Sequence, residues 1–225
     1  MKFKWFLIAA LVFSACSSFP RKTTEYFVID PDSPKIEAGS IDVQFDKYIS
    51  LAGIRKEMVD VEYYPLEDAV CLQFRLYLQT YNQFWSKKGR EAFLKALETY
   101  KEDYAAKNLQ NNRKTKKQYG TVLGYLIWRM TQFTIRAKAN MNMEIGYTFV
   151  EKSPYFVVYQ REAEYIDHAS RDNNRTSLPI MMYFTRAQAD ELAVLFDQDY
   201  LDVLAGKKAE SYNSRRSGRV DREDY

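Results

Sequence analysis

The segment VCLQFRLYLQTYNQFW, residues 70–85, alternates apolar and polar side chains and is the strongest strand signal in the chain. Alternation with period two is typical of a β-strand that buries one face. It therefore predicts one long strand and a fold dominated by sheet. The apolar even positions, which we expect to face the core, are Val70, Leu72, Phe74, Leu76, Leu78 and Phe84.

The odd positions of this segment form the second face of the predicted strand. Arginine, tyrosine and tryptophan are enriched where proteins bind partners, because each combines a large contact area with a hydrogen-bonding end. An ordinary solvent-facing sheet surface is the alternative interpretation. The candidate binding residues on this face are Arg75, Tyr77, Gln79 and Tyr81, and the face continues through Gln83 and Trp85.

Amphipathic helices are predicted on either side of a β-rich region. Ser86 is placed to cap a helix from about residue 88 to residue 108, whose apolar residues recur at three- and four-residue spacing. Thr185 and Gln188 have the spacing of a capping box, which opens a second helix. We expect this helix to continue or break near Asp197 and to end at Gly206.

The β-rich runs at 121–137, 143–151 and 155–165 follow one another through links too short for helical crossovers, so they predict an antiparallel meander. Residues 24–29 end in a proline- and aspartate-rich turn and are expected to form an edge strand, and 178–184 is expected to form a further apolar strand. The predicted fold class is α+β, a largely antiparallel sheet with two or three helices packed on one face.

The first sixteen residues have the layout of an export signal. Lys2 and Lys4 supply positive charge, and the apolar run that follows is too short to span a bilayer as a helix. The segment resembles a bacterial lipoprotein signal peptide, in which Leu11-Val12-Phe13-Ser14-Ala15-Cys16 is the lipobox. The resemblance implies cleavage before Cys16 and attachment of acyl chains to its thiol. Phe13 departs from the pattern, since most such boxes carry leucine there.

This resemblance also sets the expected organisation and location. We expect a signal peptide at 1–15, a tether at 16–23, a single α+β domain at 24–206 and a charged, disordered tail at 207–225. Ser17 follows the acylated cysteine in place of aspartate. In enteric bacteria that choice points to the outer membrane, so the expected location is the bacterial cell envelope, with the protein held by its lipid anchor.

Residues typical of catalysis or metal binding form no recognisable pattern. With Cys16 acylated, Cys71 is interpreted as a small, partly buried strand residue. His168 is the chain's one histidine, and its sequence neighbours do not have the geometry of a catalytic triad. The aspartates from Asp197 to Asp202 do not fit a calcium loop. We therefore predict no catalytic residue, metal or cofactor.

The formal net charge of +3 falls further when Lys2 and Lys4 leave with the signal peptide, which argues against nucleic acid as a partner. Residues 107–117 hold five cations and no acid, and could contact phosphate head groups or an acidic partner. The leading hypothesis is a membrane-anchored envelope lipoprotein that binds another envelope protein or a glycan, or has a structural role. The alternatives are a carboxylate-dependent hydrolase or sugar-processing enzyme, and a surface protein whose role is display.

Overall fold

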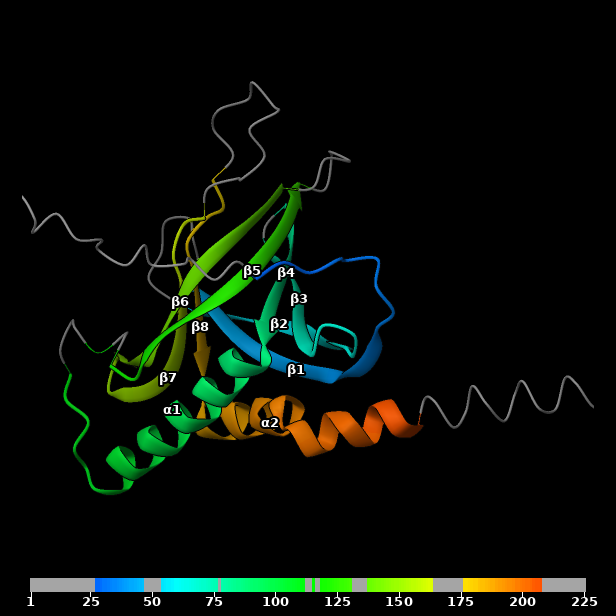
Figure 1. Cartoon of the computed structure of the whole chain (residues 1–225). Helices are drawn as coiled ribbons and strands as arrows, with labels where there is room; N and C mark the ends of the chain where they lie inside the picture. Colours follow the sequence, from blue (N-terminus) through cyan, green and yellow to red (C-terminus); the bar gives the residue numbers. More distant parts are fainter. Residues whose placement is uncertain are drawn as a thin grey trace, which may run out of the picture.

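The computed structural model describes residues 27–46, 54–76, 78–111, 115, 118–130, 137–163 and 176–207. These residues form eight antiparallel strands that close into a barrel, in which each strand pairs with its neighbours in sequence (Figure 1). The strands are β1 (Ile36–Asp46), β2 (Ile54–Tyr64), β3 (Ala69–Leu76), β4 (Gln79–Ser86), β5 (Gly120–Met130), β6 (Ala137–Val150), β7 (Ser153–Gln160) and β8 (Ile180–Phe184).

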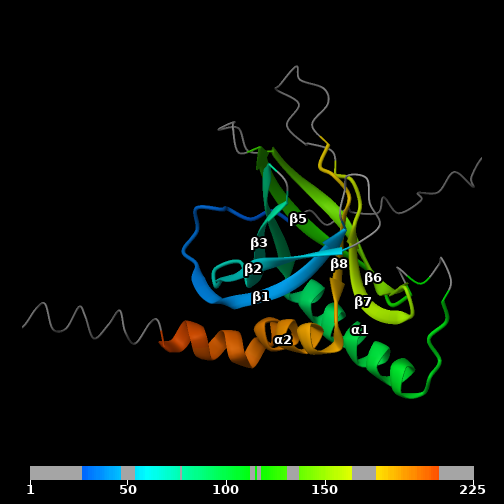
Figure 2. The ribbon, with the colours of Figure 1, turned by 180° about the vertical axis from the view of Figure 1, so that it is seen from behind.

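The helices lie together at one end of this barrel (Figures 1 and 2). α1 (Lys87–Ala105) connects β4 to β5, and α2 (Arg186–Phe196) follows β8 and leads into a further helical stretch at 198–207. The predicted α+β sheet with helices on one face is therefore wrong. The sheet closes on itself because β1 pairs with β8, with Gln44 opposite Tyr183 and Phe45 opposite Met182.

The predicted single strand over 70–85 is also wrong, because the segment forms two strands, β3 ending at Leu76 and β4 beginning at Gln79. β3 and β4 are antiparallel neighbours, with Phe74 opposite Tyr81 and Val70 opposite Trp85. Even-numbered residues face the interior in β3, whereas odd-numbered residues face it in β4. Phe84, expected in the main core, instead belongs to a cluster on the outside of the barrel.

Buried side chains fill the barrel and join those of the helices in one core. An eight-stranded barrel has an interior just wide enough for side chains to fill. Phe93 of α1 shows that the barrel and the helices share this core, because its ring packs against Trp85 of β4, Phe156 of β7 and Phe196 of α2. The interior also holds a polar pair, in which the Nε2 of Gln83 donates to the Oε1 of Gln160 at 2.9 Å.

The predicted helix starts are confirmed by their hydrogen bonds. The hydroxyl oxygen of Ser86 accepts from the main-chain N–H of Gly89 at 3.2 Å. Thr185 and Gln188 form the reciprocal bonds of a capping box. Of the two alternatives expected near Asp197, continuation or a break, the structure shows the break, since the Asp197 carboxylate accepts from the N–H of Tyr200 and so caps the stretch at 198–207.

The segment before β1 covers part of the outer barrel surface. Residues 27–29 are not in a strand, so the predicted edge strand is wrong for the described part of 24–29. Phe27 and Ile29 instead pack over an outward-facing cluster that includes Cys71. Cys71 is a free, fully buried cysteine, and burial raises the pKa of its thiol well above the ordinary value.

Several predicted segments lie outside the described residues, namely the signal peptide at 1–15, the tether at 16–23 and residues 208–225 of the predicted tail. Across the described ranges, no helix is both long enough and apolar enough to cross a membrane.

Candidate functional site

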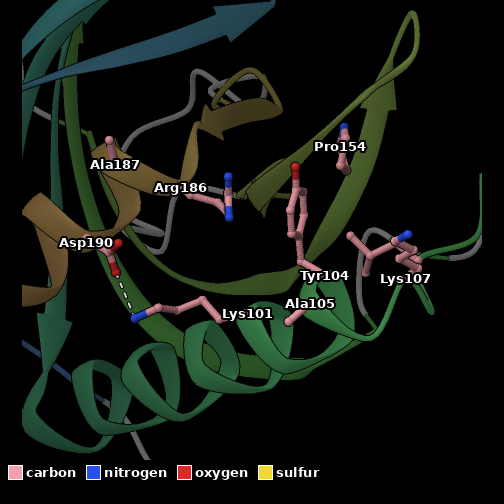
Figure 3. Close-up of a pocket in the computed structure, with 9 residues that line it drawn as sticks. Lys101, Tyr104, Ala105, Lys107, Pro154, Arg186, Ala187 and Asp190 are labelled. Atoms are coloured by element: carbon pink, nitrogen blue, oxygen red, sulfur yellow. Dashed lines mark ion pairs between the residues drawn. The ribbon is translucent and has the colours of Figure 1, made fainter.

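A groove of about 770 Å³ runs between the C-terminal half of α1, the N-terminal end of α2 and the start of β7 (Figure 3). Tyr104 stands in the middle of it, with cations around it and apolar side chains along its walls. The cations are Lys101, Lys107 and Arg186, and the apolar residues are Ala105, Leu109, Pro154 and Ala187.

α1 supplies one side of the groove through its helical spacing. Lys101 and Tyr104 are three residues apart and therefore lie on the same face of the helix. After Ala105 the chain turns at Lys107, whose φ of 59° is in the left-handed region. The N–H of Lys107 donates to the carbonyl oxygen of Tyr104 at 3.1 Å, which closes the end of the helix and leaves the Lys107 side chain at the groove.

The loop after α1 is held to the barrel by a tyrosine. The hydroxyl of Tyr147 accepts from the main-chain N–H of Gln110 at 3.0 Å and donates to its carbonyl oxygen at 3.3 Å. Both main-chain polar groups of Gln110 are thereby satisfied by one side chain of β6. The adjacent Leu109 is consequently fixed in the wall of the groove.

Arg186 brings the cation nearest to the aromatic ring. It is the first residue of α2, and its guanidinium carbon lies 4.0 Å from the centroid of the Tyr104 ring. This is the geometry of a cation–π contact. The first main-chain N–H groups of a helix have no partner within the helix, so the start of α2 at Arg186 and Ala187 adds positive potential to the groove.

The charges in the groove do not balance. The Nζ of Lys101 lies 2.9 Å from an Asp190 oxygen and 3.0 Å from a Glu98 oxygen, and Asp190 is the one acidic residue in the described lining. Hydrogen bonds to Asp190 and then Glu98 raise the pKa of Lys101, so this lysine is charged at neutral pH. Because Asp190 forms an ion pair with Lys101, the positive charges of Lys107 and Arg186 are not balanced by an acidic residue of the described lining.

A cluster of aromatic rings supports the groove from below. The hydroxyl of the buried Tyr100 donates to the carbonyl oxygen of Pro154 at 3.1 Å and joins α1 to β7. Burial, together with the neighbouring Tyr104, raises the pKa of Tyr100 to about 12. Tyr119 packs on Tyr100, and its hydroxyl donates to Asp103 at 2.9 Å. Because these rings are packed and hydrogen-bonded, Tyr104 stands on a rigid base.

The predicted binding residues are not brought together on one face. Arg75 is exposed on the outside of β3, Gln79 is half-buried at the start of β4, and Tyr77 lies outside the described residues. Tyr81 is 0% exposed and stacks on Phe74 inside the barrel, so its predicted place on a solvent-facing surface is wrong. Cys16 also lies outside the described residues.

The basic run at 107–117 was the sequence signal nearest to the groove. Lys107 lines the groove, whereas Arg113, Lys114, Lys116 and Lys117 lie outside the described residues, as does His168. Sequence reasoning missed Lys101, Tyr104 and Arg186 as binding candidates. A signal for two of them existed in the helical spacing of Lys101 and Tyr104, but no local pattern connects either residue to Arg186.

The groove suits binding of an anion next to an apolar group. Arg186 and Lys107 can pair with carboxylates or phosphates, and the apolar wall around Leu109 and Pro154 can accept a side chain. Among the residues that the structure describes, no group of three or more His, Cys, Asp or Glu side chains is placed to hold a metal ion.

Comparisons with known proteins link the chain to treponemes. A family model described as "Uncharacterised Treponema protein" matches residues 20–203. A protein of Treponema pallidum (strain Nichols), described as "Uncharacterized protein", is 26% identical over 152 residues, which cover 67% of this chain and 53% of that relative. The chain thus spans about half the length of the curated relative it matches. No solved structure matches the chain.

Proposed function

The chain belongs to the family described as "Uncharacterised Treponema protein", and we propose that it is a lipid-anchored binding module of the cell envelope. In this proposal the groove between α1 and α2 docks an acidic segment of a partner protein. The observation that carries the proposal is the stacking of the Arg186 guanidinium on Tyr104, beside a wall of apolar side chains.

The groove has the composition of a contact centre for a peptide. Arginine and tyrosine are the residue types that most often dominate binding energy, and here they are already in contact with each other. A pre-arranged arginine loses less side-chain freedom when a carboxylate binds. The volume of about 770 Å³ also lies within the usual range of binding pockets, roughly 300–1,000 Å³.

The lining favours a peptide over a purely ionic ligand. Leu109, Pro154 and Ala187 offer apolar surface that a free phosphate or sulfate would leave in water. A segment with an apolar side chain flanked by Asp or Glu would cover this wall and place its carboxylates near Arg186 and Lys107. Such charge complementarity speeds association and selects against basic partners.

The test uses a labelled synthetic peptide of alternating acidic residues and leucine, with fluorescence anisotropy as the measure of binding to the full chain. Replacing Arg186 with Glu should weaken binding at least about tenfold, because repulsion replaces a charge-assisted hydrogen bond. The matched control is Lys138→Glu, which makes the same charge change on the exposed outer face of β6.

Three results would count against the docking proposal. They are no binding of the acidic peptide, equal binding of a peptide in which lysine replaces the acidic residues, and equal weakening by Lys138→Glu and Arg186→Glu. The last result would mean that overall charge, and not the groove, governs the interaction.

The anchoring part of the proposal rests on the lipobox-like sequence that ends at Cys16. Two or more acyl chains suffice for stable anchoring, since each buried methylene contributes about 0.8 kcal/mol. Incorporation of a labelled fatty acid in cells should be lost in Cys16→Ser and kept in Cys71→Ser, which alters the chain's other cysteine. Undiminished label on Cys16→Ser would contradict the anchor. Ser17 further supports the outer membrane as the location.

A further inference from the structure

A second pocket, of about 360 Å³, lies on the outer face of β3, β4 and β5, under the segment that leads into β1. That segment is the blue stretch before β1 in Figures 1 and 2. This pocket shares no lining residue with the groove between the helices. Its lining is mostly polar, whereas that of the groove is mostly apolar.

Strand register places the polar side chains of this pocket in two rows. In one row Gln73 of β3 stands opposite Asn82 of β4, which stands opposite Ile127 of β5. In the next row Thr80 of β4 stands opposite Arg129 of β5. Because all of these residues lie on hydrogen-bonded strands, their positions are set before any ligand arrives.

Three polar side chains of the lining lack partners among the residues that the structure describes. In the part of the chain that the structure describes, no hydrogen bond or ion pair involves the side chain of Gln73, Thr80 or Arg129. The Oδ1 of Asn82 is buried and has no hydrogen-bond partner. Buried polar groups are usually hydrogen-bonded, so an unpaired amide at the base of a polar pocket points to a ligand that completes its bonds.

The opposite wall is pinned in place by contacts with β2 and the turn after it. The Nζ of Lys35 lies 2.7 Å from a Glu62 oxygen, and the hydroxyl of Ser33 donates to Glu67. Asp32, another lining residue, has its main-chain N–H bonded to Asp30 at 3.0 Å. The pocket is therefore bounded on both sides by fixed backbone.

We infer that this pocket binds a saccharide ring. Sugar hydroxyls both donate and accept hydrogen bonds, as do the amides of Gln73 and Asn82 and the hydroxyl of Thr80. An apolar ligand would leave these groups unpaired, which is costly. Arg129 could pair with a phosphate, but the carboxylate of Asp32 in the same lining would repel it. The volume lies at the lower end of the usual range for ligand pockets, roughly 300–1,000 Å³, and suits a small ligand.

The test is saturation-transfer NMR on the full chain, held in a detergent without a sugar head group, with glucose, galactose and N-acetylglucosamine as separate probes. We expect one or more of them to bind. Thr80→Val and Asn82→Leu keep side-chain shape and remove hydrogen-bonding groups, so together they should weaken binding about tenfold or more. The matched controls are Thr148→Val and Asn142→Leu on β6, which should leave binding unchanged.

Each result decides the inference. Binding that is lost in the Thr80 and Asn82 variants and kept in the β6 controls supports it. Failure of all three sugars to bind the wild-type chain overturns it, as does binding that the pocket variants do not weaken or that the controls weaken equally. If Asn82→Leu fails to fold by circular dichroism, Arg129→Gln replaces it, because Arg129 is an exposed residue of the lining.

Discussion

The Nη1 of Arg90 donates a hydrogen bond of 3.1 Å to the main-chain oxygen of Phe196, and so joins α1 to the last residue of α2. Its Nη2 lies 2.6 Å from a carboxylate oxygen of Asp68 and 3.0 Å from the side-chain oxygen of Gln198. One buried guanidinium thus connects α1, the β2–β3 turn, the end of α2 and the helical stretch at 198–207. It also places a cation at the C-terminal end of α2, where a helix favours positive charge.

We predict that Arg90→Met lowers the free energy of unfolding by about 1–3 kcal/mol, because the Phe196 oxygen and its neighbours lose their donor. Since Asp68 is partly exposed, water offsets part of the loss. Arg90→Lys should fall between wild type and Arg90→Met, since one ammonium cannot reproduce the fork of a guanidinium. Urea unfolding gives the measurement, and Lys95→Met, at an exposed position of α1, is the control. A midpoint for Arg90→Met equal to that of the control would refute the bridging role.

The local signals in the sequence predicted helix starts correctly, and the reason is physical. Ser86 and the pair Thr185 and Gln188 act on N–H groups within three residues of themselves, so no distant contact is needed. Closure of the barrel has no comparable signal. Closure depends on the pairing of Gln44 and Phe45 of β1 with β8, which are far apart in the sequence. A closed barrel and an open meander also have the same alternation of apolar and polar residues, so the sequence pattern does not distinguish them.

The end of β3 at Leu76 was missed because the sequence between Leu76 and Gln79 contains no Gly, Pro, Asn, Asp or Ser, the residues that favour turns. The alternation also seemed unbroken, since outward residues such as Phe84 are apolar where another segment covers the barrel. The groove was missed for a different reason. Tyr104 and Arg186 lie on separate helices, and only the packing of α1 beside α2 brings them together.

We predict that Tyr81 is a core residue in solution. Tyr81→Ala should lower the free energy of unfolding by about 3–5 kcal/mol, as for other large aromatic-to-alanine changes, because the ring fills the barrel beside Phe74. Tyr81→Phe removes the hydroxyl that donates to Gln79 and should cost far less. The comparison is Arg75→Ala at an exposed site, expected within about 0.5 kcal/mol of wild type. Thermal unfolding of the three variants measures these changes in stability. An unchanged midpoint for Tyr81→Ala would contradict the placement of Tyr81 in the core.

Gly124 of β5 is a site where the interior has no room for a side chain. A Cβ there would lie 2.6 Å from the methyl carbon of Met143 and 3.2 Å from the carbonyl oxygen of Phe84. Gly124→Val should therefore destabilise the barrel by about 1–3 kcal/mol through overpacking. Gly206→Ala meets no atom within 4 Å and should be neutral or stabilising, since alanine favours helix. Equal midpoints for the two variants in urea would contradict the packing described for β5.

The buried tyrosines predict loss of stability at alkaline pH. Burial raises the pKa of Tyr100 from 10.0 to about 12 and also raises the pKa values of Tyr119 and Tyr183. A tyrosine with a raised pKa keeps its proton longer when folded, so its contribution is complete below pH 10 and is lost as pH rises from 10 towards 12.

We therefore expect the free energy of unfolding, measured in urea, to fall steadily between pH 10 and pH 12. Tyr100→Phe removes one titrating group together with its hydrogen bond to Pro154, so it should be less stable than wild type below pH 10. The free energy of unfolding of Tyr100→Phe should then decline less steeply than that of wild type between pH 10 and pH 12, because one fewer proton is released on unfolding. Parallel curves for the two proteins would mean that Tyr100 has an ordinary pKa, and hence that it is not buried beneath the groove.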